Sequence, residues 1–257
     1  MVVVRSALFE IYFWIVTAVM NLAFVPGLLF DRTVTVRGQT AWAKLVMFGL
    51  RIICGIRYEV RGASVPYGGA ALVASKHMSA WDTIITHVIF DDPAVIIKKE
   101  LMKLPIYSDY CRKSGMIPVD REAGPAALKD MVRAAKDRIA QGRPLLIYPE
   151  GTRTTPGDAP DYKPGVAALY GQLNVPCIPV ALNSGRHWPT GTFLKHPGTI
   201  IVSFLPAIAP GLKRRAFMAE LETRIEAETA VLLGTKAPSD APPPQTGNET
   251  LPSPDAA

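Results

Sequence analysis

Cysteine is scarce in this sequence, whose 257 residues include only Cys54, Cys111 and Cys177. The three are too few and too scattered for a disulfide framework, and no two of them form a C-x-x-C metal-binding pair. A disulfide-stabilised secreted fold and a cysteine-based metal centre are therefore excluded. The thiols suit a reducing cytosolic setting, in which each one packs as a small hydrophobic side chain.

Charged side chains are also few. They make up 19% of the residues, whereas hydrophobic residues make up 49% and the mean hydropathy is +0.18. This balance is apolar for a soluble domain and indicates a contribution from a membrane. The formal net charge is nevertheless +6, which suits an anionic membrane surface or a phosphorylated substrate. Because the Lys and Arg residues are spread out and accompany no nucleic-acid-binding motif, we expect no nucleic-acid partner.

The longest hydrophobic run lies near the start of the chain, at residues 7–30. A helix of about 20 apolar residues can cross a bilayer. Glu10 lies inside the run and no A-x-A cleavage site follows, which argues against a secretory signal peptide. Residues 41–56 have the pattern of an amphipathic helix in the membrane interface. The sequence leaves three arrangements open: one true span, two helices that enter one leaflet and return, or buried core helices.

From about residue 58, short apolar runs alternate with amphipathic helices. This alternation predicts an α/β fold, with a mixed, largely parallel sheet flanked by helices. The clearest helix signal covers residues 125–141. We expect strands at residues 57–61, 70–75, 94–98, 116–119, 145–148, 177–181 and 200–204. The expected domains are an N-terminal two-helix membrane anchor (1–57), an α/β domain (58–235) and a disordered Pro-rich tail (236–257).

His77 and Asp82 stand in the segment A-S-K-H-M-S-A-W-D, directly after a predicted strand. Positions five apart do not face each other on a helix, but the two side chains meet if His77 lies in the preceding turn. The carboxylate then holds one imidazole nitrogen and leaves the other free as a base. The same residues fit a helix cap, with Ser79 as N-cap and Asp82 as its reciprocal partner. The two interpretations are compatible, because such a cap would fix the turn that presents His77.

Two further segments carry polar residues just beyond predicted strands. S-G-M-I-P-V-D-R ends in Arg121, whose guanidinium can grip a phosphate, although an exposed Asp-Arg pair explains the same pattern. P-L-L-I-Y-P-E-G-T-R places Glu150, Gly151, Thr152 and Arg153 in a loop, where α/β sheets gather ligand-binding groups. Gly151 permits close backbone approach, Arg153 offers charge, and Glu150 can bind a hydroxyl or orient a neighbour.

A fourth segment, V-P-C-I-P-V-A at residues 175–181, predicts a buried strand that contains two prolines. Proline cannot donate a hydrogen bond to a sheet, so we expect an edge strand or a bulge here. In functional terms, the segment with Pro179 could shape a pocket wall.

In this order and at these separations, the four segments resemble the glycerolipid acyltransferase family, and within it the bacterial 1-acylglycerol-3-phosphate acyltransferases. The resemblance covers roughly residues 60–204, and the combination of H-x-x-x-x-D with P-E-G-T-R is its most specific part. It implies that His77 is the general base and that Asp82 orients it. It also implies that substrate is bound by Arg121, Glu150, Gly151, Thr152, Arg153 and Pro179.

The resemblance implies transfer of a fatty acyl group from acyl-CoA or acyl-acyl carrier protein to the sn-2 hydroxyl of lysophosphatidic acid, forming phosphatidic acid. A thioester is already activated, so we expect no metal and no other cofactor. Three alternatives stay open. The first is acylation of another lysolipid, such as lyso-ornithine lipid or lysophosphatidylethanolamine. The second is lipid hydrolysis, and the third is a non-catalytic membrane adaptor. We expect the enzyme at the bacterial inner (cytoplasmic) membrane, its catalytic domain on the cytoplasmic face. Basic residues there would meet anionic lipid: Arg51, Arg57, Lys98, Lys99 and Lys103.

Overall fold

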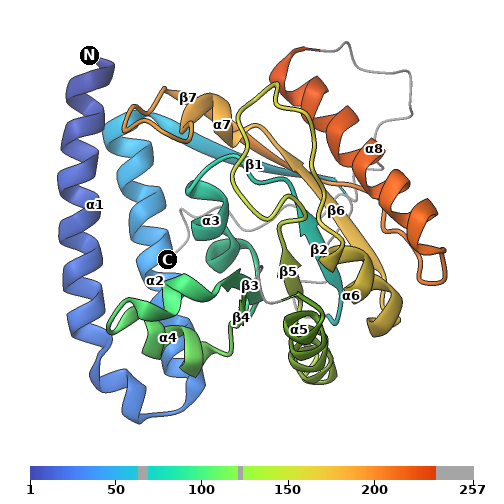
Figure 1. Ribbon diagram of the computed structural model, residues 1–257. Coiled ribbons are helices and arrows are strands. Elements are labelled where there is room, and N and C mark those ends of the chain that lie inside the picture. The colour runs from blue at the N-terminus through green and yellow to red at the C-terminus, as the bar shows by residue number, and fades with distance from the viewer. Residues whose placement is uncertain (63–68, 121–123, 236–257) are drawn as a thin grey trace.

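The N-terminal helices form a hairpin beside an α/β domain (Figure 1). The computed structural model describes residues 1–62, 69–120 and 124–235, so the tail predicted at 236–257 lies outside the described residues. The first helix ends at Phe24, shortly before Pro26, because proline has no N–H with which to continue the helical hydrogen bonds. The hairpin consists of α1 (Val2–Phe24), the 3-10 turn η1 (Pro26–Leu29), α2 (Arg32–Gly49) and the π-helical turn η2 (Leu50–Cys54).

Helix α2 begins earlier than its hydrophobic pattern predicts. Apolarity indicates a helix at residues 41–56, whereas α2 already starts at Arg32. The mostly polar stretch at residues 32–40 is helical because it packs against α1. A Cβ atom at Gly38 would lie 2.5 Å from the ring of Phe24, so the helices approach closely here. Close packing of this kind depends on a missing side chain, which a hydrophobicity pattern does not register.

Helix α1 exposes apolar side chains along most of its length. Together with η1 it is, among the described residues, the one helix long and apolar enough to cross a membrane. Only 6% of its most apolar window is buried, so α1 is not a buried core helix, whereas the second helix contributes Val46 and Met47 to the core. Trp14 and Leu22 illustrate this, with exposed fractions of 64% and 67%.

The described strands form one seven-stranded sheet in the order β1-β7-β6-β2-β5-β3-β4. Every neighbouring pair is parallel except β6 and β7, which confirms the predicted mixed, largely parallel sheet. The strands are β1 (Ile56–Gly62), β2 (Leu72–Ser75), β3 (Ala94–Lys98), β4 (Ile117–Val119), β5 (Leu145–Ile147), β6 (Cys177–Leu182) and β7 (Gly198–Phe204).

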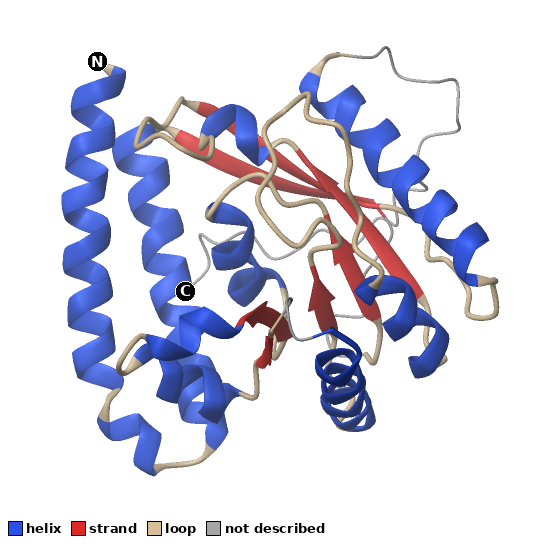
Figure 2. Ribbon diagram, viewed as in Figure 1, coloured by secondary structure: helices blue, strands red, loops and turns tan. Residues whose placement is uncertain are grey.

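Helices cover both faces of the sheet (Figure 2). One apolar core joins the hairpin and α3 (Trp81–Ile89) to the sheet. A second core, on the other face, contains residues of α5 (Gly124–Ala140), α6 (Gly165–Leu173) and α8 (Arg214–Leu233). The remaining helical elements are η3 (Lys99–Lys103), α4 (Tyr107–Ser114) and α7 (Ser184–His187).

The proline-containing strand β6 is not an edge strand, because it lies between β2 and β7 and all its residues are buried. The predicted bulge is present beside Pro179: Val180 pairs with Phe204 but Cys177 pairs with Ile208, so the chain after β7 carries one extra residue. Pro179 is tolerated because its missing N–H falls on the side of β7, where regular pairing begins only at Val180. The carbonyl of Pro179 still accepts a hydrogen bond from the N–H of Leu205, at 3.0 Å.

Candidate active site

The candidate residues gather at one edge of the sheet because two neighbouring strands end there. His77 follows β2, and the loop that begins at Pro149 follows β5. Strands β2 and β5 pair in parallel, with Leu72 beside Leu145, so their carboxyl ends reach the same edge. Ligand-binding groups of open α/β sheets lie outside these carboxyl ends.

His77 and Asp82 are in contact across the turn between β2 and α3. The Nδ1 atom of His77 lies 2.9 Å from Oδ2 of Asp82, which is 1% exposed. The same oxygen accepts hydrogen bonds from the backbone N–H groups of Met78, at 2.7 Å, and Ser79, at 2.8 Å. The hydroxyl of Ser79 in turn accepts a hydrogen bond from the N–H of Trp81, at 3.1 Å. The helix-cap interpretation and the paired interpretation therefore hold together, since one carboxylate closes the turn and binds the imidazole.

This arrangement determines what the imidazole can do. A carboxylate accepts hydrogen bonds, so we assign the proton of a neutral His77 to Nδ1, which leaves Nε2 as a free base. The ring stacks on Tyr148, with centroids 4.1 Å apart, which limits its rotation. His77 also reaches the pocket described below. The geometry is that of a general base held by an acid.

The loop after β5 fixes the turn that carries His77. The N–H of Thr154 donates to the carbonyl of His77 at 2.8 Å, and the hydroxyl of Tyr148 donates to the carbonyl of Asp82 at 2.9 Å. Gly151 has a φ of +70°, a backbone conformation that glycine adopts without strain. Its own N–H is used within the loop, because it donates to the carbonyl of Tyr148.

Glu150 lies behind the turn, where it contacts a neighbouring backbone group, the second of the two roles that its sequence left open. Its side chain is buried and is not among the described residues that line the pocket. One carboxylate oxygen accepts the backbone N–H of His77 at 2.9 Å, and the other accepts the hydroxyl of Thr154, also at 2.9 Å. Burial raises the pKa of Glu150, and the ammonium of Lys76, 2.6 Å away, opposes this rise. Glu150 therefore holds the backbone of the candidate base.

A pocket of about 500 Å³ extends from His77 toward the helical hairpin. Its walls are mainly apolar, with aromatic side chains from α1 and α2 on one side and strand β3 on the other. A largely apolar cavity of this volume suits a hydrocarbon chain, because burial of apolar surface is favourable. Its apolar lining includes Phe13, Trp14, Met20, Phe24, Trp42, Ile84, Val95, Ile97, Leu101 and Met116.

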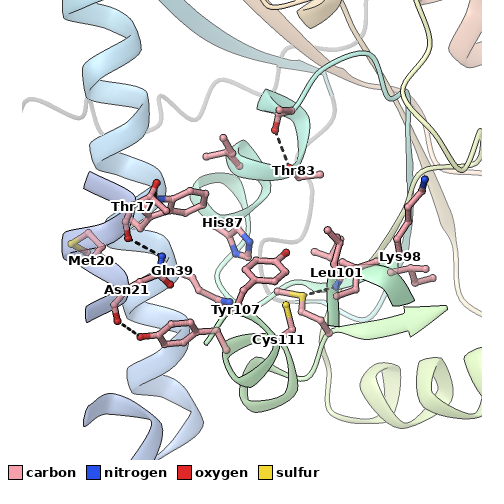
Figure 3. A pocket seen from close by; sticks show the side chains of 18 of the residues that line it. Thr17, Met20, Asn21, Gln39, Thr83, His87, Lys98, Leu101, Tyr107 and Cys111 are labelled. Carbon is pink, nitrogen blue, oxygen red and sulfur yellow. Dashed lines mark hydrogen bonds between the residues drawn. The ribbon is translucent and has the colours of Figure 1, made fainter. Parts of the chain in front are cut away.

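Several polar side chains interrupt the apolar wall of the pocket (Figure 3). The indole N–H of Trp42 donates to the hydroxyl of Thr17 at 3.1 Å, which ties α2 to α1. The side-chain amide of Asn21 donates to the carbonyl of Thr17 at 2.7 Å. His87 also faces this region, and burial lowers its pKa to about 4, so its imidazole is neutral at physiological pH.

The remaining predicted residues are distributed unevenly around the pocket. Gly151, Thr152 and Arg153 line its mouth together with His77, and Arg153 is exposed there. Arg121 lies outside the described residues. Pro179, inside the sheet, is not among the described residues that line the pocket. The described residues also contain no group of three or more His, Cys, Asp or Glu side chains placed to hold a metal ion.

Comparison with known proteins identifies the family. The family model described as Acyltransferase matches residues 57–183. The chain is 34% identical to a 1-acyl-sn-glycerol-3-phosphate acyltransferase of Pseudomonas aeruginosa over 187 residues, which cover 72% of each chain. The chain belongs to the acyltransferase family.

More distant relatives agree with this assignment. The acyltransferase is 32% identical to the mouse 1-acyl-sn-glycerol-3-phosphate acyltransferase alpha, over 65% of this chain and 60% of the mouse protein. Its fold matches the crystal structure of the 1-acyl-sn-glycerophosphate acyltransferase PlsC from Thermotoga maritima, with a TM-score of 0.73 at 20% identity. That match covers 94% of this chain and 100% of the other.

The pocket of the acyltransferase depends on residues outside the segment that the family model matches. Phe13 and Trp42 come from the hairpin, before residue 57. Sequence reasoning assigned the hairpin to the membrane and missed its second role as a pocket wall. The available signal was the group of aromatic residues in α1 and α2, but the same group also fits membrane insertion.

Proposed function

We propose that this acyltransferase transfers a fatty acyl group from an acyl thioester, acyl-CoA or acyl-acyl carrier protein, to the sn-2 hydroxyl of 1-acylglycerol-3-phosphate. The product would be phosphatidic acid, a precursor in phospholipid biosynthesis. The observation that carries the proposal is the imidazole of His77, held through Nδ1 by the buried carboxylate of Asp82 where the apolar pocket begins. The substrate is supported by the name of the Pseudomonas aeruginosa relative, which is 34% identical.

In this reaction, Nε2 of His77 takes the proton of the acceptor hydroxyl as its oxygen attacks the thioester carbonyl. The new C–O bond forms, the C–S bond breaks, and the proton passes to the departing thiolate. Asp82 stabilises the imidazolium that exists between the two proton transfers, because its charge lies 2.9 Å from Nδ1.

The phosphate of the acceptor needs positive charge near the mouth of the pocket. Arg153 is exposed there, and Lys98 lines the same pocket. Arg121 would complete the phosphate site. Guanidinium groups bind phosphate in a bidentate manner, so the hydroxyl would be positioned relative to His77 and not merely present.

The membrane holds the lysolipid acceptor, and the hairpin gives the enzyme access to it. Helix α1 is long and apolar enough to insert, and the pocket runs from the hairpin to His77. We place the enzyme at the bacterial cytoplasmic membrane with its catalytic domain on the cytoplasmic face, against anionic lipid.

A transfer assay with matched variants tests the proposal. Purified enzyme receives a labelled acyl-CoA or acyl-acyl carrier protein and a panel of lysolipids that includes 1-acylglycerol-3-phosphate. We expect His77→Ala to lower the rate by about 10²–10⁴-fold, whereas His196→Ala, at an exposed histidine, keeps it. Wild-type activity of His77→Ala would refute the mechanism. A preference for another lysolipid would reassign the acceptor, and release of free fatty acid without acceptor would indicate a hydrolase.

A further inference from the structure

Lys76, the residue before His77, is a buried cation between two carboxylates. It is 4% exposed, and its Nζ lies 2.6 Å from Oε1 of Glu150 and 2.8 Å from Oε1 of Glu226. Removing one partner from a buried ion pair leaves an uncompensated charge, so buried pairs constrain their surroundings strongly. Both carboxylates are therefore fixed relative to the turn that carries His77.

Glu226 connects this turn to a distant part of the chain. It lies on α8, well beyond residue 183, where the family match ends. The carboxylate also accepts a hydrogen bond from the hydroxyl of Tyr162, at 2.9 Å. Although burial acts to lower the pKa of Lys76, its hydrogen bonds to Glu150 and Glu226 raise that pKa overall, so the ammonium stays charged.

The contacts form a continuous chain from α8 to the candidate base. Glu226 binds Lys76, Lys76 binds Glu150, and Glu150 accepts the backbone N–H of His77 at 2.9 Å. Among the described residues, the other hydrogen-bond partners of Glu150 are neutral: the backbone N–H of His77 and the hydroxyl of Thr154. The direction of the Glu150 carboxylate thus depends on where Lys76 is held.

We propose that Glu226 is a positioning residue for the transfer reaction: through Lys76 and Glu150 it fixes the backbone of His77, and so makes α8 part of the catalytic apparatus. The inference rests on the proposed function, because it assigns a role in the step that His77 performs. Glu226 touches neither substrate nor the reacting atoms. Its effect is on geometry, and displacement of a reacting group by about 1 Å can cost 10²-fold in rate.

The test compares Glu226→Gln with Glu228→Gln. Glu228 lies on the same helix and accepts a hydrogen bond from Ser203 at 2.8 Å, so it controls for the loss of a carboxylate from α8. We expect Glu226→Gln to lower kcat by about 10- to 100-fold with little change in KM, the mark of an effect confined to the transition state. Glu228→Gln should keep kcat.

Two further measurements separate positioning from stability. In hydrogen exchange, the backbone N–H of His77 should exchange faster in Glu226→Gln than in Glu228→Gln, while the N–H groups of the sheet strands stay protected. In a Lys76→Gln background, Glu226→Gln should cause no further loss of kcat, because Glu226 acts through Lys76.

Several outcomes would overturn the inference: equal kcat losses in the two glutamine variants, an additive loss in the Lys76→Gln background, or unfolding of Glu226→Gln at the assay temperature. The last would show that Glu226 serves stability. The His77→Ala assay separates these outcomes from failure of the proposed function. If His77→Ala is inactive and the two glutamine variants behave alike, only the role of Glu226 is refuted.

Discussion

Replacement of Asp82 by asparagine separates the two tasks of this side chain. Its Oδ2 accepts two backbone N–H groups and also binds the imidazole of His77. Asparagine has nearly the same shape, and its amide oxygen can still accept the backbone bonds. The turn should therefore keep its conformation, while the imidazole loses its charged partner.

The size of the effect follows from this geometry. A hydrogen bond to a charged group contributes about 1.5–3 kcal/mol, which corresponds to roughly 10- to 150-fold in rate. The oxygen that faces Nδ1 also accepts both backbone N–H groups, so the amide oxygen of asparagine keeps that place and the tautomer of His77 is preserved. We therefore expect Asp82→Asn to lower kcat by about 10- to 150-fold.

The assay is steady-state acyl transfer, accompanied by thermal unfolding of each variant in the same detergent. Asp158→Asn is the matched control, because Asp158 also accepts a backbone N–H three residues away, that of Thr155, but in an exposed turn. Asp158→Asn should keep kcat. A rate for Asp82→Asn within threefold of the wild type, at unchanged unfolding temperature, would refute the role of Asp82 in holding the base.

Two predictions concern stability. Burial lowers the pKa of His87 to about 4, so between about pH 6.5 and pH 4 the unfolded chain binds a proton at this residue that the folded chain does not. The free energy of unfolding should therefore fall by about 3 kcal/mol as the pH decreases through this range, and this contribution should be absent in His87→Leu. Unfolding free energies that change with pH in parallel for the two proteins would contradict this. A Cβ at Gly49 would lie 2.1 Å from the ring of Tyr12, so Gly49→Ala should lower the unfolding temperature. At Gly171 a Cβ meets open space, so the control Gly171→Ala should raise the unfolding temperature, with a gain of about 0.5–1 kcal/mol in unfolding free energy. Equal changes of unfolding temperature in the two variants would show that the hairpin repacks freely.

The sequence alone determined the features that depend on near neighbours. Alternating apolar runs predicted the strands and the α/β class, because a buried strand needs apolar side chains wherever it lies. The contact of His77 with Asp82 was also predictable, since the two residues share one turn and a cap motif. The four segments with their spacing were enough to indicate the family.

Only the tertiary structure decided which polar groups line the pocket and which hold the site together. Glu150 contacts the backbone of a residue 73 positions away, and Lys76 pairs with a carboxylate 150 positions away. A local pattern records the charge of such residues but not their partners, so the sequence could not show that Glu150 holds the backbone of His77 or that Glu226 pairs with Lys76. The hairpin's role as a pocket wall could not be predicted for the same reason. An aromatic residue such as Trp42 suits either a membrane or a cavity until the packing of α1 against α2 is known.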